Sequence, residues 1–517
     1  MIRKELGAGA LTIGLMGALA ACANDAAEPL ADPPRVDVGR TTPSDLGGDR
    51  HDGDGDRHDD DRHDGSLPND RRFSNPSGYA ATHSTTGSVD LTGPFFQSLG
   101  TNGRSCGTCH LPTDGWTIIP ENVRERFERT GGTDPIFRTN DGSNSPTADV
   151  STVAKRRTAY SMLLTKGLIR VSNPVPAGAD YTLVAVDDPY HHASAADVST
   201  FRRPLPTANL GAISTVMWDG RETQTTLATD PDLMGCSLPP TAPKCWKSIV
   251  TDLRTQSNDA TLGHAQATLG LVPAQQDRIV AFENSLFFAQ VFDVDANELT
   301  SKGAHGGPVE LASREFYFGE NDVLSGDYRT HAAFTTKVFD EYDAWAVARG
   351  NGSVERSRRA VARGQELFNS KPINIAGVKG INDDFGIPVL VGSCTTCHDT
   401  PHGGNHSIPA PLDIGLTGDH PEALVRTADL PLYTFARNAD GATFTTTDPG
   451  RGLITGRFKD LGRFKGPVLR GVAARAPYFH NGSAATLDDA VRFYDQRFTI
   501  GLTAEERADL VAFLKTL

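Results

Sequence analysis

Methionine and cysteine are both scarce in this chain of 517 residues, which has five Met and seven Cys. Basic residues are also in deficit, because 50 Lys and Arg stand against 64 Asp and Glu and give a formal charge of −14. A chain without a basic excess lacks the electrostatic footprint of a nucleic-acid-binding protein, so we expect no nucleic-acid partner. The 52 Gly and 32 Pro are typical of a globular protein rich in loops.

Long apolar runs are missing, and the longest near the start covers Leu6 to Ala21, only sixteen residues. This run follows Arg3 and Lys4 and is too short for a comfortable membrane span. It ends at Cys22 after small residues, which resembles a bacterial lipoprotein signal. We therefore expect residues 1–22 to be a signal peptide; an ordinary signal cleaved elsewhere is the alternative. Both interpretations predict export, and the first predicts an outer-membrane lipoprotein on the periplasmic side, held to the membrane by its lipid anchor alone.

Residues 23–72 have few large apolar side chains and many Asp, Arg and His. Such a segment cannot bury enough surface to offset its ordering entropy, which predicts a disordered acidic tether. Alternating aspartates resemble a calcium loop, but Arg57 and His63 occupy the positions of its Gly and bidentate Glu. Weak metal binding stays open for the histidines of this segment: His51, His58 and His63.

Four of the cysteines form two C-x-x-C-H motifs, the attachment signature of c-type haem. The two thiols form thioethers to the porphyrin, and the adjacent imidazole becomes the proximal iron ligand. A thioredoxin-like pair or a four-Cys zinc site would not require a His directly after the second Cys. We therefore predict two covalently bound haem c groups, attached through Cys106, Cys109 and His110 and through Cys394, Cys397 and His398.

The remaining cysteines, Cys236 and Cys245, enclose eight residues. In an oxidising compartment this spacing predicts a small structural disulfide loop.

The two motifs lie 288 residues apart, so we expect each haem to have its own domain, at 73–352 and 353–517. Capping boxes at Thr486 and Thr503 predict two C-terminal helices, the first of which buries Tyr494. Apolar and polar residues do not alternate strongly enough to predict a large sheet. The expected fold is mainly α, with two cytochrome-c-like haem domains and long ordered loops.

Two further segments carry a family resemblance: M-W-D-G-R-E at 217–222 and the stretch 463–482 with its P-Y-F-H sequence. With both haem motifs they resemble the bacterial dihaem cytochrome c peroxidase and MauG family over roughly residues 95–517. The resemblance implies that the N-terminal haem reacts with hydrogen peroxide and that the C-terminal haem relays or stores oxidising equivalents. It also implies that Trp218 bridges the two haems, whereas a core Trp without a redox role is the alternative.

The second ligand of the relay haem is constrained by the scarcity of methionine. None of the five Met lies beyond residue 234, so a His/Met haem in the second domain would have to borrow its Met from the first. In the family the ligand lies fourteen residues beyond the His of P-Y-F-H, and in MauG it is Tyr; that position here is Tyr494. An open position and four histidines remain as alternatives: His402, His406, His420 and His480.

The distal pocket of the reactive haem departs from the family. Relatives have a helix with a Gln and, ten residues later, an acid that helps to break the O–O bond. Here the Gln is Gln256, but Gln266 stands where the acid is expected. His264 is then the best local acid/base or a ligand of the resting iron, and a hydrogen-bonded helix His is the alternative. The predicted catalytic residues are His264, Gln256, Gln266 and Trp218.

The family also has a calcium ion between the haems, but Arg203 and Arg475 stand where its Asn and Thr are expected, so calcium is left open. The sequence favours a peroxidase or oxidase that uses hydrogen peroxide. Its partner would be a small electron-donor cytochrome or cupredoxin, or a protein substrate. A non-catalytic, lipid-anchored electron-transfer cytochrome is the alternative, and dioxygen-dependent cleavage of an organic polymer is a weaker third.

Overall fold

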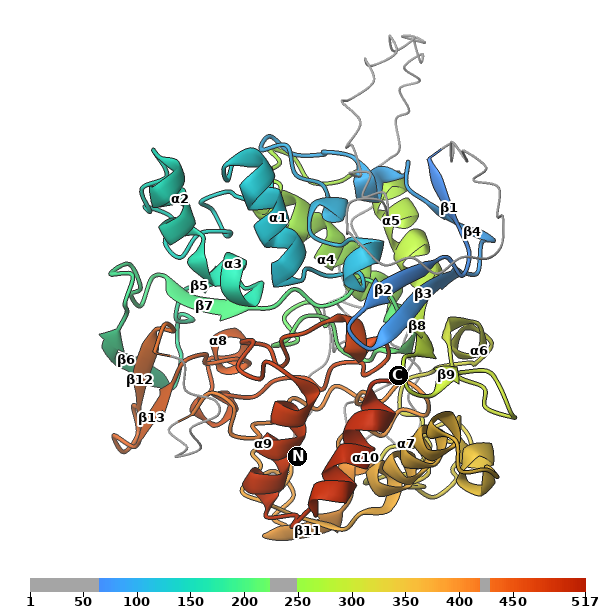
Figure 1. Ribbon diagram of the computed structural model, residues 1–517. Coiled ribbons are helices and arrows are strands. Elements are labelled where there is room, and N and C mark those ends of the chain that lie inside the picture. The colour runs from blue at the N-terminus through green and yellow to red at the C-terminus, as the bar shows by residue number, and fades with distance from the viewer. Residues whose placement is uncertain (1–64, 224–248, 419–427) are drawn as a thin grey trace, which may run out of the picture.

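A computed structural model describes residues 65–223, 249–418 and 428–517 (Figure 1). The predicted signal peptide, the Cys236–Cys245 disulfide loop and His420 lie outside these residues. None of the helices in the described ranges is long and apolar enough to cross a bilayer. The described α-helices are α1 Pro120–Thr130, α2 Val153–Ala159, α3 Ser161–Lys166, α4 Val250–Gly263, α5 Pro273–Ser285, α6 Pro308–Ala312, α7 Ser353–Ser370, α8 Gly452–Thr455, α9 Leu487–Phe498 and α10 Ala504–Leu514.

The expectation of a mainly α fold is wrong, because the described residues also form five small sheets. Strands were missed because most are short, and a short buried apolar run has no periodicity that distinguishes it from a helix. β8 shows this, since the first five of its eight residues are all buried. The sheets combine β1 Ser66–Pro68 with β4 Ser88–Asp90; β2 Arg72–Asn75, β3 Gly78–Ser84, β8 Leu286–Asp293 and β9 Asn297–Glu298; β5 Ile169–Asn173 with β7 Val198–Arg202; β6 Tyr181–Asp187, β12 Leu432–Arg437 and β13 Thr443–Thr446; and β10 Ile373–Ala376 with β11 Val389–Gly392.

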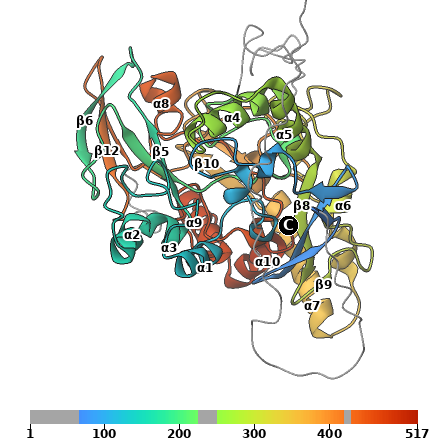
Figure 2. The same cartoon turned by 90° about the horizontal axis from the view of Figure 1, so that it is seen from above.

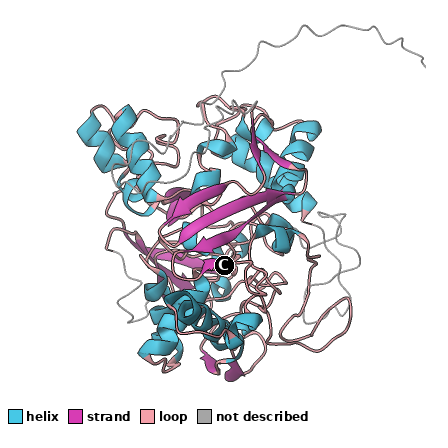
Figure 3. Ribbon diagram, turned by 45° about the vertical axis from the view of Figure 1, so that its right-hand side comes forward, coloured by secondary structure: helices cyan, strands magenta, loops and turns pink. Residues whose placement is uncertain are grey.

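The four-stranded sheet β2-β3-β8-β9 lies between two groups of helices (Figure 3). Its central strands pair antiparallel, with Ala81 opposite Ala289. Helices α1 to α5 lie on one side with the first haem motif, and α7, α9 and α10 lie on the other with the second (Figure 1). Phe95, Trp116 and Phe288 fill the core on the first side, and Phe339, Phe368 and Phe513 fill it on the second.

The C-terminal helices begin where the sequence predicts. Thr486 and Thr503 cap α9 and α10 by accepting a hydrogen bond from the third backbone amide of each helix. The helix expected to start at Ser353 is α7, which packs closely against α10 (Figure 1).

The predicted boundaries at 72/73 and 352/353 do not coincide with breaks in the structure. Residues 66–68, within the predicted tether, form β1 and pair with β4. Strand β12 from the C-terminal part pairs with β6 from the N-terminal part, in a sheet at one edge of the molecule (Figures 1 and 2). The two predicted haem domains are therefore joined by shared main-chain hydrogen bonds.

Candidate functional site

Both C-x-x-C-H motifs adopt the same local structure, a single 3-10 turn at Cys106–Thr108 and at Cys394–Thr396. In each, the Ser before the first Cys donates its backbone N–H to the hydroxyl of the Thr before the second Cys, at 2.9 Å in the first motif and 3.0 Å in the second. This hydrogen bond helps to hold the two cysteines one turn apart, as two thioether bonds to one porphyrin require.

The histidines that follow each motif are oriented by backbone carbonyls. His110 Nδ1 lies 2.9 Å from the Trp116 carbonyl oxygen, and His398 Nδ1 lies 2.6 Å from that of Gly404. A carbonyl oxygen only accepts, so Nδ1 carries the proton and Nε2 keeps its lone pair for iron. Burial lowers the pKa of His110 to about 4 and also lowers that of His398, so both rings are neutral, as proximal ligands must be.

Each motif opens into a large cavity. The cavity around His110 is called here the N-terminal cavity, and the one around His398 is called the C-terminal cavity. Both are lined mainly by apolar side chains and include the cysteines of their motif. Cavities with this lining suit a bound porphyrin.

Three buried cations line the C-terminal cavity and have no carboxylate partner within the described residues: Arg203, Lys465 and Arg475. Arg203 and Lys465 also line the N-terminal cavity. Burial lowers the pKa of Arg203 and of Arg475 to about 10 and that of Lys465 to about 7. Unpaired buried cations are costly unless an anion joins them. The propionate carboxylates of haem would supply that anion, so these residues fit the predicted cofactor.

The same cations bear on the calcium alternative. Arg203 and Arg475 are both buried at the place where the family's calcium ligands are expected. The two guanidinium groups repel a divalent cation, so this chain's own residues do not support a calcium site there.

One face of α4 lines the N-terminal cavity and ends at His264. His264 Nδ1 lies 2.5 Å from Asp141 Oδ2, and Arg104 forms an ion pair with the other oxygen of Asp141. Burial would raise the pKa of Asp141, but the hydrogen bond from His264 and the charge of Arg104 outweigh it and lower that pKa. The ionised Asp141 therefore holds the Nδ1 proton of His264, which leaves Nε2 as a proton acceptor.

The two predicted glutamines have different positions. Gln256 lies on the same face of α4 as His264, and both residues line the N-terminal cavity. Gln266 follows the end of α4 with a positive φ of 55°, and its exposed side chain accepts a hydrogen bond from Asn102. Gln266 is not among the cavity-lining residues, because the left-handed backbone turns it away from the helix face.

Sequence reasoning missed two acids of this cavity, Asp141 and Glu283. Glu283 comes from α5, is 3% exposed, and has a buried oxygen without a hydrogen-bond partner among the described residues. Burial raises the pKa of Glu283 to about 8, so the carboxyl is mostly protonated at neutral pH. The only sequence signal of the burial of Glu283 was the apolar residues near it in the stretch A-F-E-N-S-L.

Trp218 lines both cavities. Its indole Nε1 donates to the Arg203 carbonyl oxygen at 2.7 Å, and its ring meets the His480 ring edge-on at 6.0 Å. The turn that contains Trp218 is held by Asp219, which is fully buried and paired with Arg202 and Arg221. The indole therefore has a rigid position in the common wall of the two cavities.

Tyr494 projects from α9 into the C-terminal cavity together with Leu487, Ala490 and Val491, the face that the sequence predicts. No described residue hydrogen-bonds its hydroxyl. Burial raises the pKa of Tyr494, with a further contribution from the thiols of Cys397 and Cys394, so its neighbours do not ionise it. The positive charge of a bound iron ion would favour ionisation of Tyr494.

The histidine alternatives differ in position. His406 and His480 also line the C-terminal cavity, whereas His402 does not. His480 stacks on Phe464 at 4.2 Å, and burial lowers the pKa of His406 to about 3.

Comparison with known proteins supports this interpretation. Residues 463–499 match the family model described as RoxA-like, cytochrome c-like. The cytochrome-c peroxidase IdrP1 of Denitromonas iodatirespirans is 34% identical over 144 residues, which cover 24% of this chain and 36% of that protein. The cytochrome c peroxidase Ccp of Escherichia coli K12 is 45% identical over 75 residues, 14% of this chain and 16% of that protein.

The cytochrome-c peroxidase IdrP1 of Pseudomonas sp. strain SCT is 27% identical over 216 residues, 38% of this chain and 48% of that protein. The matches thus span at most about half the length of these relatives. A solved MauG-like protein associated with microbial copper homeostasis aligns with 82% of this chain and 85% of its own, at 16% identity and a TM-score of 0.33. With two C-x-x-C-H motifs that adopt the same turn, the chain is similar over the matched segments to bacterial cytochrome-c peroxidases.

Proposed function

We propose that the protein is a dihaem peroxidase or oxidase in which hydrogen peroxide reacts in the N-terminal cavity. The observation that carries the proposal is the His264–Asp141 pair, which faces the same cavity as His110. A cytochrome that only transfers electrons needs no acid/base pair beside its iron, whereas O–O cleavage does.

Reduction of hydrogen peroxide to two water molecules consumes two electrons and two protons. Bound haem supplies the redox chemistry of this step. His264 Nε2 would accept a proton from one oxygen of hydrogen peroxide and return it to the other oxygen, which leaves as water. Asp141 keeps the Nδ1 proton in place, and Arg104 keeps Asp141 ionised, so the imidazole holds one orientation and one tautomer. Gln256 would orient the peroxide as a hydrogen-bond donor.

We further propose that the C-terminal haem relays or stores oxidising equivalents and that Tyr494 is its second ligand. The free hydroxyl of Tyr494 in the His398 cavity supports this assignment. An anionic oxygen ligand lowers the reduction potential and stabilises oxidised iron. Trp218, in the wall common to both cavities, is the proposed bridge for electrons between them.

The electrons would come from a small cytochrome or cupredoxin, or from a protein substrate that is oxidised. We propose that the chain is exported, because its start has the features of a lipoprotein signal. A lipid on Cys22 would hold the protein at the periplasmic face of the outer membrane.

The test is EPR with optical spectra of the purified ferric protein before and after one equivalent of peroxide. We expect two haems per chain, one of them high-spin or weakly ligated and rapidly changed by peroxide. Two low-spin haems that peroxide does not alter would overturn the proposal in favour of a non-catalytic electron-transfer cytochrome.

A further inference from the structure

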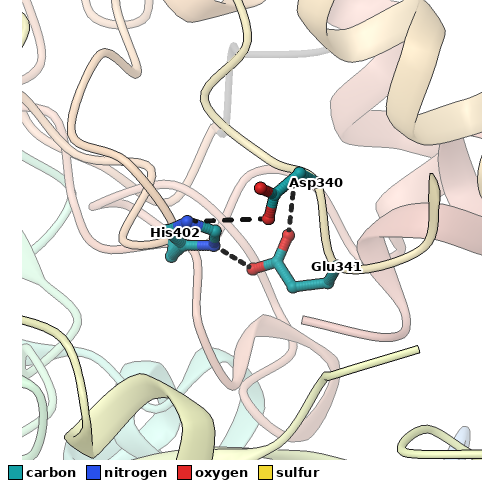
Figure 4. A group of neighbouring side chains, drawn as sticks. All are labelled: Asp340, Glu341 and His402. Atoms are coloured by element: carbon teal, nitrogen blue, oxygen red, sulfur yellow. Dashed lines mark hydrogen bonds and ion pairs between the residues drawn. The ribbon is translucent and has the colours of Figure 1, made fainter. Parts of the chain in front are cut away.

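Outside both cavities, a group of ionisable side chains gathers beside the loop that follows His398. Glu341 is fully buried, forms an ion pair with Arg470, and lies 3.0 Å from His402 Nδ1 through its Oε1 atom. Figure 4 shows the His402 ring with one nitrogen toward Glu341 and the other toward Asp340. The cluster is distinct from the haem sites, since neither Asp340 nor His402 lines a haem cavity.

The protonation of His402 follows from its neighbours. An ionised carboxylate paired with Arg470 can only accept, so His402 Nδ1 carries the proton and donates it to Glu341. Nε2 of His402 then presents a lone pair toward Asp340.

Asp340 Oδ1 is the atom that the other side chains of the cluster surround. It lies 3.7 Å from His402 Nε2 and 3.6 Å from His305 Nε2, and it is buried without a hydrogen-bond partner among the described residues. Two acceptor atoms such as Asp340 Oδ1 and His402 Nε2 that face one another at this separation are stabilised by a cation between them. Ligand atoms about 3.3 Å apart are expected around a tetrahedral zinc ion with bonds near 2.0 Å. The ring of His305, whose centroid lies 6.5 Å from that of His402, would have to turn toward His402 to complete this geometry.

The surrounding charges permit a cation. Glu310, Asp340 and Glu341 carry three negative charges, and Arg314 and Arg470 carry two positive ones. Arg314 is 3.9 Å from Asp340 Oδ1, beyond hydrogen-bond distance, and lies closer to Glu310 at 3.1 Å. The side chains of Asp340 and His305 are 41% and 36% exposed, which leaves a path for an ion from solvent.

We propose that His305, Asp340 and His402 bind a divalent transition metal of the zinc type, with a solvent molecule as the fourth ligand. Glu341 orients His402, in the carboxylate–histidine–metal arrangement common to protein metal sites. Two imidazoles and one carboxylate form a ligand set that favours zinc over calcium or magnesium.

The site would also connect to the C-terminal haem through a short loop. The Arg470 Nε atom donates to the His402 carbonyl oxygen at 2.7 Å, and the Gly404 carbonyl two residues on orients His398. Metal occupancy would therefore stiffen the loop that holds the proximal ligand.

The experiment is equilibrium dialysis of the holoprotein against zinc chloride after treatment with a chelator, with zinc and haem iron measured by atomic emission. The background is a triple variant, H51A/H58A/H63A, which removes the histidines of the tether. We expect one tightly bound zinc per chain in this background. Asp340→Asn should weaken binding by about 100-fold, and His305→Ala by a similar factor.

Asp343→Asn is the matched control, since it removes the same charge from an exposed neighbour that pairs with Lys337. This control should bind zinc as the background does, and the haem content of all variants should be equal. Absence of one stoichiometric zinc in the background protein, or zinc binding that survives Asp340→Asn, would overturn the proposal. Either result would mean that His402 and His305 are only polar neighbours of Asp340.

Discussion

The N-terminal and C-terminal cavities share a wall and the same C-x-x-C-H turn, yet their linings differ in chemistry. The first collects ionisable groups from distant segments: Arg104, Asp141, His264 and Glu283. The second has no carboxylate among its described lining residues and is mainly aliphatic and aromatic, with the phenol of Tyr494 and the cations Arg203, Lys465 and Arg475 also in its wall. The difference teaches that two copies of one attachment motif acquire separate roles through what surrounds the iron, since proton transfer needs polar partners and electron storage needs only a suitable ligand.

Removing the acid/base from the N-terminal cavity should have the largest effect on the difference between the two cavities. His264→Ala should slow the reaction with peroxide by about 100- to 10,000-fold, because no other described imidazole besides His110 lines that cavity. Stopped-flow absorbance with excess peroxide measures the rate. His331→Ala, at an exposed position, is the control and should react as the parent does. A rate for His264→Ala within threefold of the parent would show that the proton is transferred elsewhere.

Removing only the partner of His264 should have a smaller effect. Asp141→Asn keeps the shape but loses the charge that fixes the tautomer, so we expect a loss of about 10- to 100-fold in the same rate. Asp149→Asn, at a surface ion pair with Lys155, is the charge-matched control. An unchanged rate in Asp141→Asn would mean that the hydrogen bond to His264 is structural.

A substitution in the C-terminal cavity should change the spectrum of its haem but hardly change the rate of the first reaction with peroxide. Tyr494→Phe is expected to change the EPR signal of the C-terminal haem and to raise its reduction potential, because an anionic oxygen ligand is lost. The initial rate with peroxide should change by less than about threefold. Potentiometric titration monitored by optical spectra gives the potential. Identical EPR spectra of variant and parent would contradict Tyr494 ligation, and loss of the signal in His406→Ala instead would identify that residue as the ligand.

Glu283 is expected to affect stability and its dependence on pH. With a pKa near 8 in the folded protein and about 4.5 when unfolded, the folded state holds the extra proton between these values. Stability therefore falls as pH rises from about 4.5 to 8, and at pH 7 the cost is about 3 kcal/mol. Glu283→Gln should remove this dependence, raising Tm by a few degrees at pH 7 and leaving it unchanged at pH 4.5. Thermal unfolding at several pH values checks this, and equal slopes in variant and parent would contradict it.

Much of the chemistry could be predicted from the sequence because its signals are local. The two C-x-x-C-H motifs, the W-D-G-R turn, and the capping box that places Tyr494 on one face of α9 each lie within about a dozen residues. His264 was found in the same way, from the helix pattern around Gln256. Gln266 was misplaced relative to the cavity, because spacing along a helix no longer applies after a residue with positive φ ends it.

Contacts between distant segments carry little signal in one sequence. Asp141 lies 123 residues from its partner His264, and Glu341 lies 61 from His402. The sheets were missed for a related reason, since β6 and β12 come from distant parts of the chain and their pairing depends on the fold around them. Glu283 was missed because a single acid in an apolar stretch has no pattern until its burial is known.

The pairing of β12 with β6 limits how this protein can be divided or recombined. Six residue pairs join these strands, and Arg202 of the first half binds both Asp219 and Asp448, one from each half. Expression of residues 353–517 alone would leave an unpaired sheet edge and a buried Asp448 without its cation. Chimeras that exchange one haem half between relatives should therefore fold only if the matching strand and arginine are exchanged with it, so in evolution the two halves are expected to change together as a single inherited unit.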